Sequence, residues 1–431
     1  MKNIRYYGFW LLDALKGGKI KKNFDEIKYL LEQEDISDWQ NEKINILLKN
    51  AIANCKFYSG YDKYTDISQC PVINKAVIKE SYNDILSTDF DKTTLHKMST
   101  SGSTGTPFEI LQNVEKRNRV VAELIYFNSI IGQNIGDKFI FYRVWTDKNK
   151  KSRIVQIKQN LLPIDILRLN DENLKYIANV LLKDKKIKST LAYASTYDMI
   201  YNYMKKNNIK GKFNVKAMVS SSELLTDTTR DGLEELIGCR VVNRYSNQEN
   251  GVIAQSDLFH RELVINGASY YVELLKLDSD EPAQPGEEGR IVVTDLFNYA
   301  MPLIRYDTGD LGIISDSEKG IYGFKSISGR RVDMIYDTKG RPLTPHTWSV
   351  YMWKYDKIKQ YQFIQDGAND YTLKVNGAEE IYSEDDLKQT LKGVLGDDAK
   401  IKIEFVKEIP VLASGKFKKT ICNYNPLENV I

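Results

Sequence analysis

Apolar residues recur at helical spacing in the first part of the chain. In residues 41–54 they fall at Ile44, Leu47, Leu48, Ala51 and Ile52. This is the i, i+3, i+4, i+7, i+8 stripe of a helix that buries one face. We therefore expect residues 1–97 to form a mainly helical lead-in.

Between residues 138 and 296 the pattern changes to short apolar runs that alternate with helical segments. The predicted strands are 139–144, 190–194, 216–220 and 240–245, and the predicted helices are 198–207 and 226–237. Strands that alternate with helices indicate a parallel sheet with helices on both faces. Ligands bind at the carboxyl ends of the strands in such a sheet, where residues 220–223 and 245–249 lie.

After residue 329 the pattern predicts a small α+β domain. Its strands are 360–365, 371–375 and 400–406, and its helix is 384–395. The predicted fold class is therefore α/β: a large N-terminal region with mostly parallel sheets and helices, followed by a small α+β C-terminal domain. We place the boundary between residues 1–329 and 330–431.

Composition supports a large apolar core and no strongly charged partner. The chain of 431 residues is 42% hydrophobic, and its 61 basic and 58 acidic residues give a net charge of +3. A charge so near zero gives no argument for a nucleic-acid partner. The four cysteines lie far apart, which predicts neither a zinc site nor a disulfide framework and fits a cytoplasmic compartment.

The first residues are basic and then apolar, as in a signal peptide. Asp13, however, interrupts the apolar run that ends at Leu12, and lysines follow. No run approaches the ~20 apolar residues that span a bilayer. Two interpretations stay open: an amphipathic helix that docks on its own protein, or one that touches a membrane surface.

A run of hydroxyl and glycine residues follows the helical lead-in. It reads Thr100, Ser101, Gly102, Ser103, Thr104, Gly105, Thr106, Pro107. Glycines let backbone N–H groups approach an anion, and such runs form nests for phosphate. The run is not a Walker A loop, since no G-x-x-x-x-G-K-[ST] occurs in the chain. By itself such a run is more often a mobile surface loop.

Further segments accompany this run in a fixed order. They are Ser220-Ser221-Ser222-Glu223, Tyr245-Ser246-Asn247-Gln248-Glu249, Pro285-Gly286-Glu287-Glu288-Gly289-Arg290, Pro302-Leu303-Ile304-Arg305-Tyr306-Asp307-Thr308-Gly309-Asp310, Gly329-Arg330-Arg331-Val332-Asp333 and Ser414-Gly415-Lys416. Upstream stand Lys56-Phe57-Tyr58 and Cys70-Pro71-Val72-Ile73-Asn74-Lys75. Together they resemble the adenylate-forming (AMP-binding) enzyme superfamily, and within it the phenylacetate–coenzyme A ligases and their capsule-biosynthesis relatives.

The resemblance implies a role for each matched residue. It implies that Ser101 to Thr106 bind ATP phosphates and that Glu249 holds Mg²⁺. It implies that Asp310 binds the ribose hydroxyls, that Arg330 binds the nucleotide at a hinge, and that Lys416 is the catalytic lysine of a mobile domain. The residues that it places beside the nucleotide are Ser222, Glu223, Tyr245 and Ser246. A carboxylate suits a vicinal diol because it accepts two hydrogen bonds. This chain departs from the family pattern at Ser222 and Ser246, usually Gly, at Gln248, usually Thr, and at Val332, usually the hinge Asp. As an alternative for Ser222, it caps the helix that follows.

The resemblance implies that a carboxylic acid attacks ATP to give an acyl-adenylate and pyrophosphate, with coenzyme A as the acyl acceptor. One alternative is transfer to another acceptor, such as a sugar amine in surface-polysaccharide synthesis. Another is a nucleotide-binding protein that does not catalyse, as the departures at Ser222 and Val332 suggest. From their positions at strand ends, Tyr142, Tyr193, Ser195, Ser221 and Asn247 are candidates for the acid pocket. No G-x-S-x-G is present, so a hydrolase has little support.

Overall fold

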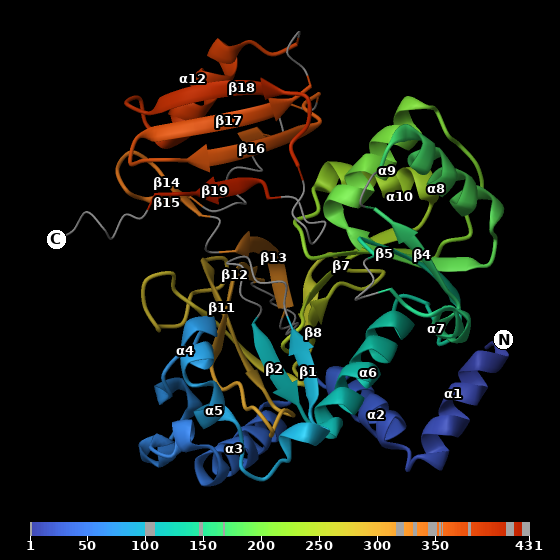
Figure 1. Cartoon of the computed structure of the whole chain (residues 1–431), viewed down its shortest axis with the longest axis vertical. Coiled ribbons are helices and arrows are strands. Elements are labelled where there is room, and N and C mark those ends of the chain that lie inside the picture. Colours follow the sequence, from blue (N-terminus) through green and yellow to red (C-terminus); the bar gives the residue numbers. More distant parts are fainter. Residues whose placement is uncertain are drawn as a thin grey trace. The chain divides into compact units, whose positions relative to one another are not determined.

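The structure is a computed structural model of the chain (Figure 1). It describes residues 2–99, 108–145, 150–166, 169–315, 323–330, 334–343, 351–352, 355, 357–377, 381–410 and 418–424. By its internal contacts the chain divides into two compact units. Unit 1 comprises Met1–Thr308 and Gly312–Ser326, and unit 2 comprises Gly309–Leu311 and Ile327–Ile431. The domain boundary after residue 329 stays a prediction.

The described residues up to 95 form helices and turns. The helices are α1 (Ile4–Leu15), α2 (Lys19–Leu31), α3 (Ser37–Asn54), α4 (Lys75–Glu80) and α5 (Tyr82–Ile85), with short 3-10 helices at Lys56–Tyr58, Tyr61–Lys63, Ile67–Gln69 and Lys92–Thr94. The predicted stripe on α3 faces inward, because Ile44, Leu47 and Ala51 are buried. Tyr58 is also buried, and its hydroxyl donates to the carbonyl of Pro302 over 2.8 Å. These contacts fasten the helical lead-in to the chain near residue 300.

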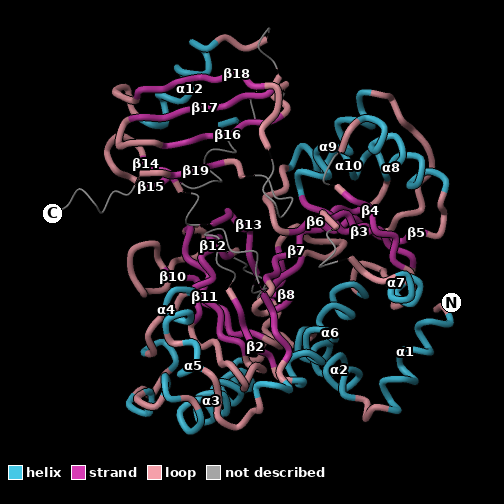
Figure 2. Tube along the Cα trace, viewed as in Figure 1, coloured by secondary structure: helices cyan, strands magenta, loops and turns pink. Residues whose placement is uncertain are grey.

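Unit 1 is organised around a large sheet. Its strand order is β10-β11-β12-β13-β9-β8-β7-β6-β5-β3-β4. The strands are β3 (Lys138–Arg143), β4 (Leu161–Asp165), β5 (Ile187–Tyr193), β6 (Ala217–Ser221), β7 (Arg240–Asn247), β8 (Gly251–Gln255), β9 (Leu263–Ile265), β10 (Tyr270–Leu275), β11 (Glu288–Asp295), β12 (Tyr306–Ile314) and β13 (Gly323–Arg330). A separate hairpin pairs β1 (His96–Ser99) with β2 (Glu109–Gln112) in antiparallel orientation. Figure 2 shows the strands of the sheet and the helices beside them.

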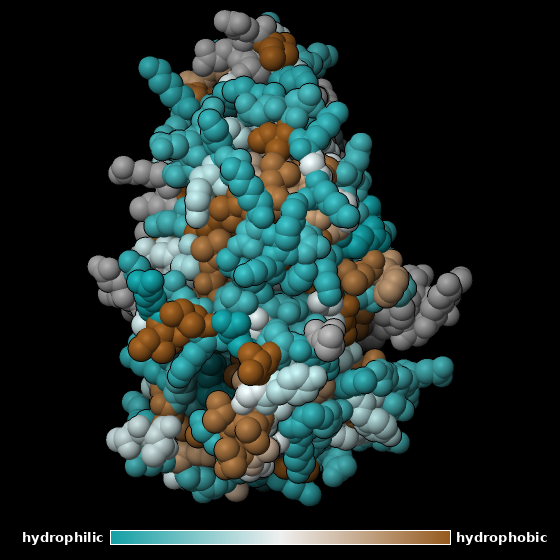
Figure 3. All heavy atoms as spheres, turned by 90° about the vertical axis from the view of Figure 1, so that its right-hand side faces the viewer, coloured by the Kyte–Doolittle hydropathy of each residue, from teal (hydrophilic) through white to brown (hydrophobic). Residues whose placement is uncertain are grey.

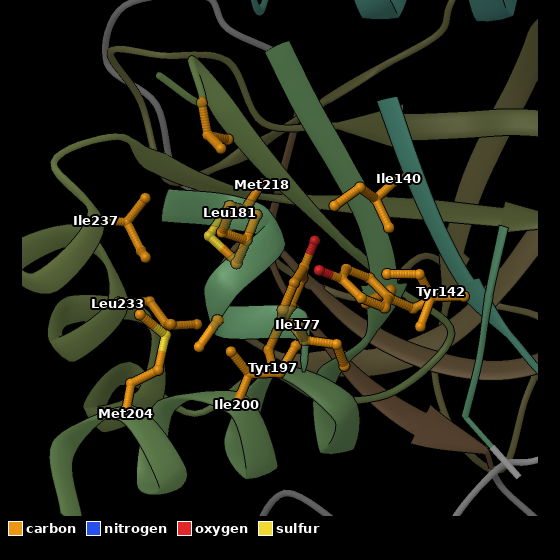
Figure 4. Close-up of a cluster of buried hydrophobic side chains, with 14 of the residues drawn as sticks. Ile140, Tyr142, Ile177, Leu181, Tyr197, Ile200, Met204, Met218, Leu233 and Ile237 are labelled. Carbon is orange, nitrogen blue, oxygen red and sulfur yellow. The ribbon is translucent and has the colours of Figure 1, made fainter. Parts of the chain in front are cut away.

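Helices enclose the parallel part of this sheet. They are α6 (Val114–Ser129), α7 (Arg153–Gln159), α8 (Asp171–Lys183), α9 (Ala194–Lys206) and α10 (Asp227–Ile237). Apolar side chains of α8, α9 and α10 pack on those of β3 and β6, as Figure 4 shows for Leu181, Ile200 and Leu233. A second set, Ile131, Ala217, Val219 and Val242, is buried in a cluster of its own. Burial of strand side chains in both clusters explains the continuous apolar runs of this region.

Unit 2 contains a four-stranded sheet in the order β18-β17-β16-β19. The elements are β14 (Ile335–Tyr336), β15 (Pro342–Leu343), β16 (Gln360–Gln365), β17 (Asp370–Asn376), α12 (Glu384–Leu395), β18 (Lys400–Val406) and β19 (Thr420–Cys422). Leu387 and Leu391 of α12 are buried against Phe363 and Leu373 of the sheet. The amphipathic pattern of α12 thus closes the core of this unit.

The predicted α/β class, with a large first part and a small α+β second part, is confirmed. The large sheet is mixed rather than mostly parallel. Strands β7, β6, β5 and β3 are parallel as predicted, and β4, which was not predicted, adds a further parallel strand. In contrast, β8 and β9 turn back in antiparallel hairpins and β10 pairs antiparallel with β11. Short connections permit only antiparallel neighbours, since a parallel pair needs a crossover. Within the described residues, no helix is both long and apolar enough to cross a membrane.

Candidate active site

The β1–β2 hairpin fixes both ends of the hydroxyl and glycine run. Ser99 is paired with Glu109 in the hairpin register, so residues 99 and 109 lie directly opposite one another. Residues 100–107, which include the predicted phosphate-binding residues Ser101 to Thr106, lie outside the described residues. Phe108, the first described residue after them, is buried. The run therefore starts and ends at one place on unit 1.

Glu249 lies in the turn between β7 and β8. The residue is 2% exposed to solvent. The Lys75 ammonium lies 2.8 Å from its Oε1, and the Tyr306 hydroxyl donates to the same oxygen over 3.0 Å. Gln112 Nε2 donates to the Glu249 carbonyl over 2.8 Å. The Glu249 carboxylate is therefore buried, and Lys75 is its ion-pair partner within the part of the chain that the structure describes.

Phe108, which directly follows the hydroxyl and glycine run, contacts the same group of residues. The Phe108 ring is stacked on the Tyr306 ring at a centroid distance of 6.4 Å. The Lys75 ammonium lies 5.4 Å from the Phe108 centroid. Because Tyr306 and Lys75 both bind Glu249, the run returns to the sheet beside this carboxylate. Gln112, at the end of β2, binds the backbone of Glu249 itself.

Lys75 reaches Glu249 because the chain before it is bound to β12. The Ile73 amide donates to the Arg305 carbonyl over 3.0 Å, and the Asp307 amide donates to the Ile73 carbonyl over 2.7 Å. Asn74 then caps α4, accepting from the amides of its first turn. Lys75 is the first residue of that helix. Its contact with Glu249, which lies 174 positions later (249 − 75), has no local signal in the sequence, so no role was predicted for Lys75.

The Asp-Thr-Gly-Asp segment forms the start of β12. Asp307 is buried beside Arg290, 3.1 Å away, and the Thr308 hydroxyl donates to the Ile291 carbonyl over 2.9 Å. Gly309 has φ +79°, in the left-handed region that favours glycine. Asp310 follows and is half-buried. All four residues of the motif lie in β12, and the ribose contact of Asp310 stays a prediction.

The structure describes only some of the other residues that were predicted to bind the nucleotide. Arg330 is the last residue of β13, and its side chain is outside the described part of the chain, as are Val332 and Lys416. Tyr245 is buried, and its hydroxyl donates to the Thr308 hydroxyl over 3.2 Å. The structure thus joins Tyr245 to the Asp-Thr-Gly-Asp segment. It does not place Arg330 and Lys416 relative to them.

The carboxyl ends of β5, β6 and β7 lie side by side. Tyr193 is paired with Ser221, and Ser221 with Arg244. Ser195 lies in the first turn of α9, where its amide donates to the Glu223 carboxylate over 2.8 Å. The predicted pocket residues Tyr193, Ser195 and Ser221 are therefore brought together at this edge. Glu223 holds the start of α9.

Ser222 does not cap a helix. The cap of α10 is Thr226, whose side chain accepts from the Thr229 amide, so the capping alternative for Ser222 was wrong. Ser222 instead has φ +71°. Such a conformation costs a residue with a Cβ about 1–2 kcal/mol and is the usual place of glycine. The geometry therefore explains why related motifs have Gly here.

Asn247 and Tyr142 differ from the other pocket candidates. The Asn247 side chain accepts from the Asn250 amide over 2.7 Å and so shapes the turn that carries Glu249. Ser246 is paired with Val252 in the same hairpin. Tyr142 is fully buried in the core cluster of Figure 4, edge to face with Tyr197, and burial raises the pKa of its hydroxyl. Its position is that of a core residue.

A buried charged network holds the backbone that follows Glu249. The Tyr270 hydroxyl lies 2.8 Å from the Asn250 carbonyl, and the Val252 amide donates to Glu123 over 3.2 Å. Lys116 lies 3.0 Å from the same hydroxyl and 2.7 Å from Asp295. The network was missed by the sequence analysis, because charged residues on an amphipathic helix are normally solvated.

Glycine at position 251 lets this network approach. Gly251 has φ +135°, and a Cβ there would lie 2.6 Å from a Glu123 oxygen and 2.8 Å from the Tyr270 hydroxyl. The neighbouring Asn250 is fully buried, and neither atom of its side-chain amide has a hydrogen-bond partner in the described part of the chain. A buried polar group without a partner is costly. The turn therefore leaves an unsatisfied amide next to a buried carboxylate.

A family model and two curated proteins match this chain. Residues 335–423 match the family described as the CapK C-terminal domain. Protein CapK from Staphylococcus aureus is 27% identical over 428 residues, which cover 94% of this chain and 93% of that protein. Phenylacetate-coenzyme A ligase from Aromatoleum evansii is 30% identical over 105 residues, 24% of this chain and 21% of that protein.

A solved structure shares the fold. It is 2-hydroxyisobutyryl-CoA ligase in the postadenylation state, in complex with R3-HIB-AMP. The likeness has a TM-score of 0.71 and covers 93% of this chain and 92% of that chain, at 14% identity. At that identity it establishes the fold of this chain.

Proposed function

Because the chain is homologous to Protein CapK and to phenylacetate-coenzyme A ligase, we propose that it uses ATP to activate a carboxylic acid as an acyl-adenylate. One observation supports this above the others. Residues 100–107 begin and end in a hairpin whose strand β2 and adjoining Phe108 contact the Glu249 site. A phosphate-binding run beside a buried carboxylate is the arrangement that Mg-ATP requires.

The residues at Glu249 fit a magnesium ion. Mg²⁺ prefers oxygen ligands and is usually bound through one or two carboxylates together with phosphates and water. Glu249 supplies the carboxylate, and the Tyr306 hydroxyl that donates to it holds its position. In the described part of the chain, no group of three or more His, Cys, Asp or Glu side chains forms a protein cage. When bound, the ion neutralises phosphate charge, and Lys75 balances Glu249 before it arrives.

In the proposed reaction, a carboxylate oxygen of the acid attacks the α-phosphorus of ATP. A P–O bond forms, the bond to the bridging oxygen of the β-phosphate breaks, and pyrophosphate leaves with the electron pair. Asp310 accepts from the ribose hydroxyls, Arg330 binds the nucleotide, and Lys416 stabilises the charge on the α-phosphate and the carboxylate. The acid lies at the ends of β5 and β6, near Tyr193, Ser195 and Ser221.

The acyl group then passes to an acceptor, with release of AMP. Coenzyme A is the acceptor we propose first, since two of the similar proteins are coenzyme A ligases by name. An amine, such as that of a sugar in surface-polysaccharide synthesis, is the second candidate, and the end-to-end similarity to Protein CapK favours it. Thioester and amide products differ in their lability to hydroxylamine, which gives a direct readout.

ATP–pyrophosphate exchange tests the adenylation step. The purified full chain would be incubated with Mg-ATP, labelled pyrophosphate and each member of a panel of aliphatic, aromatic and amino acids. We expect acid-dependent exchange with at least one class. Exchange excludes a protein that only binds nucleotide. If ATP binds but no acid in a broad panel supports exchange, the non-catalytic alternative replaces our proposal.

Two substitutions separate binding from chemistry. Lys416→Ala should abolish adenylation and leave ATP affinity largely unchanged, because the lysine acts on charge that develops in the transition state. Asp310→Ala should weaken nucleotide binding itself, since it removes the acceptor for the ribose hydroxyls. Exchange at the wild-type rate in the first variant, or unchanged ATP affinity in the second, would remove that residue from the proposed site.

A further inference from the structure

Helix α1 has two unlike faces. One face packs on unit 1: Trp10 lies against Phe24 at a centroid distance of 5.7 Å, and the buried Asp13 accepts from the amides of Ile20 and Lys21. This confirms that the helix docks on its own protein. The opposite face remains exposed and is apolar. It consists of Ile4, Tyr7, Leu11, Leu12 and Leu15, each at least 60% exposed.

The exposed face is surrounded by positive charge. Residues 2–24 contain six basic residues, Lys2, Arg5, Lys16, Lys19, Lys21 and Lys22, and one acidic residue, Asp13, which gives 6 − 1 = +5. Asp13 is buried and used as a helix cap, so it does not offset this charge at the surface. In the described part of the chain, Arg5, Lys16, Lys19 and Lys22 have no ion-pair partner.

Helix α7 likewise has exposed apolar residues with basic residues beside them. Its Ile154 and Ile157 are exposed, and Lys150, Lys151, Arg153 and Lys158 around them are exposed basic residues, with no acidic residue in 150–160. The turn at 134–137 connects the two helices, because Asn3 donates to the Ile135 carbonyl over 3.1 Å and Asn160 donates to the Gly136 carbonyl over 2.9 Å. Figure 3 draws the side on which α1 lies in Figure 1, and apolar patches are among the hydrophilic residues of its lower part.

We propose that this basic apolar face, formed by α1 and α7, binds the surface of an anionic lipid membrane. Amphipathic helices with aliphatic residues on one side and lysines beside them lie in the interface plane, and anionic headgroups attract their basic residues. Charge also argues against a second copy as the occupant. A symmetric dimer would place Arg5, Lys16 and Lys19, which have no ion-pair partner within the described residues, against the same residues of the other copy.

Vesicle flotation of the full chain tests the proposal. The probes are vesicles of phosphatidylcholine alone and vesicles that also contain phosphatidylglycerol. We expect flotation with the anionic vesicles and loss of it at high salt. Failure to float with anionic vesicles, or equal binding to both kinds, would overturn the proposal. So would concentration-dependent self-association that depends on α1 in the absence of vesicle binding.

A matched pair of variants identifies the face. Leu12→Glu changes a residue of α1, and Ile381→Glu changes a residue of unit 2 with the same 60% exposure. We expect Leu12→Glu to weaken vesicle binding at least about tenfold, since one buried leucine is lost from the interface, and Ile381→Glu to bind as the wild type. Should Leu12→Glu misfold by circular dichroism, the double variant Lys16→Glu, Lys19→Glu tests the same face through charge. Equal binding by the α1 variant and the control would overturn the assignment.

Discussion

Two clusters of charged groups contact the same turn between β7 and β8. In the first, Glu249 is paired with Lys75, whose side chain is 33% exposed. In the second, Glu123, Asp295 and Lys116 are fully buried. The first cluster contains the residue proposed to hold a metal, and the second binds the backbone of Asn250 and Val252. Both clusters combine a lysine with carboxylates, and they differ in how far these side chains are exposed to water.

Access to water decides what each cluster can do. A partly exposed lysine can leave its carboxylate and turn to solvent, so Glu249 can exchange a lysine for a metal ion. A buried pair has no such exchange, because removing one partner leaves a desolvated charge. The buried cluster is therefore suited to fix the turn, and the partly exposed one to bind a ligand.

The largest effect is expected for Lys116→Met, which breaks the buried cluster. Loss of the ammonium leaves the buried Asp295 without its described ion-pair partner and removes one of the cations that act on Glu123, and we expect ~3–5 kcal/mol of stability to be lost. Urea unfolding measures this. Lys276→Met is the matched control at the exposed Lys276–Glu281 pair, 2.6 Å apart, where at most ~1 kcal/mol is expected. Similar losses in both variants would contradict the difference drawn between the clusters.

Glu249→Gln should affect activity more than stability. Removing the carboxylate charge should lower ATP–pyrophosphate exchange by about a hundredfold, equivalent to ~2.7 kcal/mol of barrier. The unfolding free energy should change little, because Lys75 can turn to water. The two quantities are measured on the same preparation. A large loss of stability with unchanged exchange would assign Glu249 to structure.

Tyr270→Phe tests whether the buried cluster positions the other one. Its hydroxyl contacts Asn250, Glu123 and Lys116, and its loss should cost ~1–3 kcal/mol through unsatisfied groups. Exchange should fall as well, by less than in Glu249→Gln, at a temperature where the variant is fully folded. Wild-type exchange in a folded, destabilised variant would show that the network acts on stability alone.

The smallest effect is a change in pH dependence. Burial raises the pKa of Glu123 above its ordinary value of 4.5. The folded state therefore keeps this proton at pH values where the unfolded chain has lost it, so the wild type loses stability as pH rises from about 4.5 through the folded pKa. Glu123→Gln cannot titrate. Its unfolding free energy, relative to the wild type, should increase over that range, and a constant difference would contradict the raised pKa.

Local patterns predicted unit 2 well. Strands β16 and β18 and helix α12 have the predicted bounds, because each buries one face against neighbours and its spacing shows in the sequence. Strand β4 was missed because Pro163 lies within it. Proline cannot donate to a sheet and is confined to edges, and β4 is the last strand of the sheet order. A sequence does not reveal which strand will be at the edge.

The candidate site was predicted only in its motif residues. Gln112 and Tyr306 both contact Glu249, and Phe108 stacks on Tyr306, so the chain directly after the hydroxyl and glycine run lies near this carboxylate. The roles assigned to the run and to Glu249 stay predictions. Lys75 and the contacts of α6 in the buried network were not predicted, because they join residues more than a hundred positions apart. The left-handed φ of Ser222 was also hidden, since serine gives no sign that the backbone there requires glycine-like freedom.

The close approach at Gly251 has a consequence for how this protein can change over generations. Lysine, glutamate and aspartate of the network can be replaced singly by residues of similar size, each at some loss of stability. A side chain at 251 would meet Glu123 and Tyr270 at once and would also have to adopt φ +135°. We therefore expect substitution of Gly251 to be tolerated less often than substitution of the charged residues. Among related sequences, those with glycine at this position are the ones in which Glu123 and Tyr270 can make the same contacts with the turn.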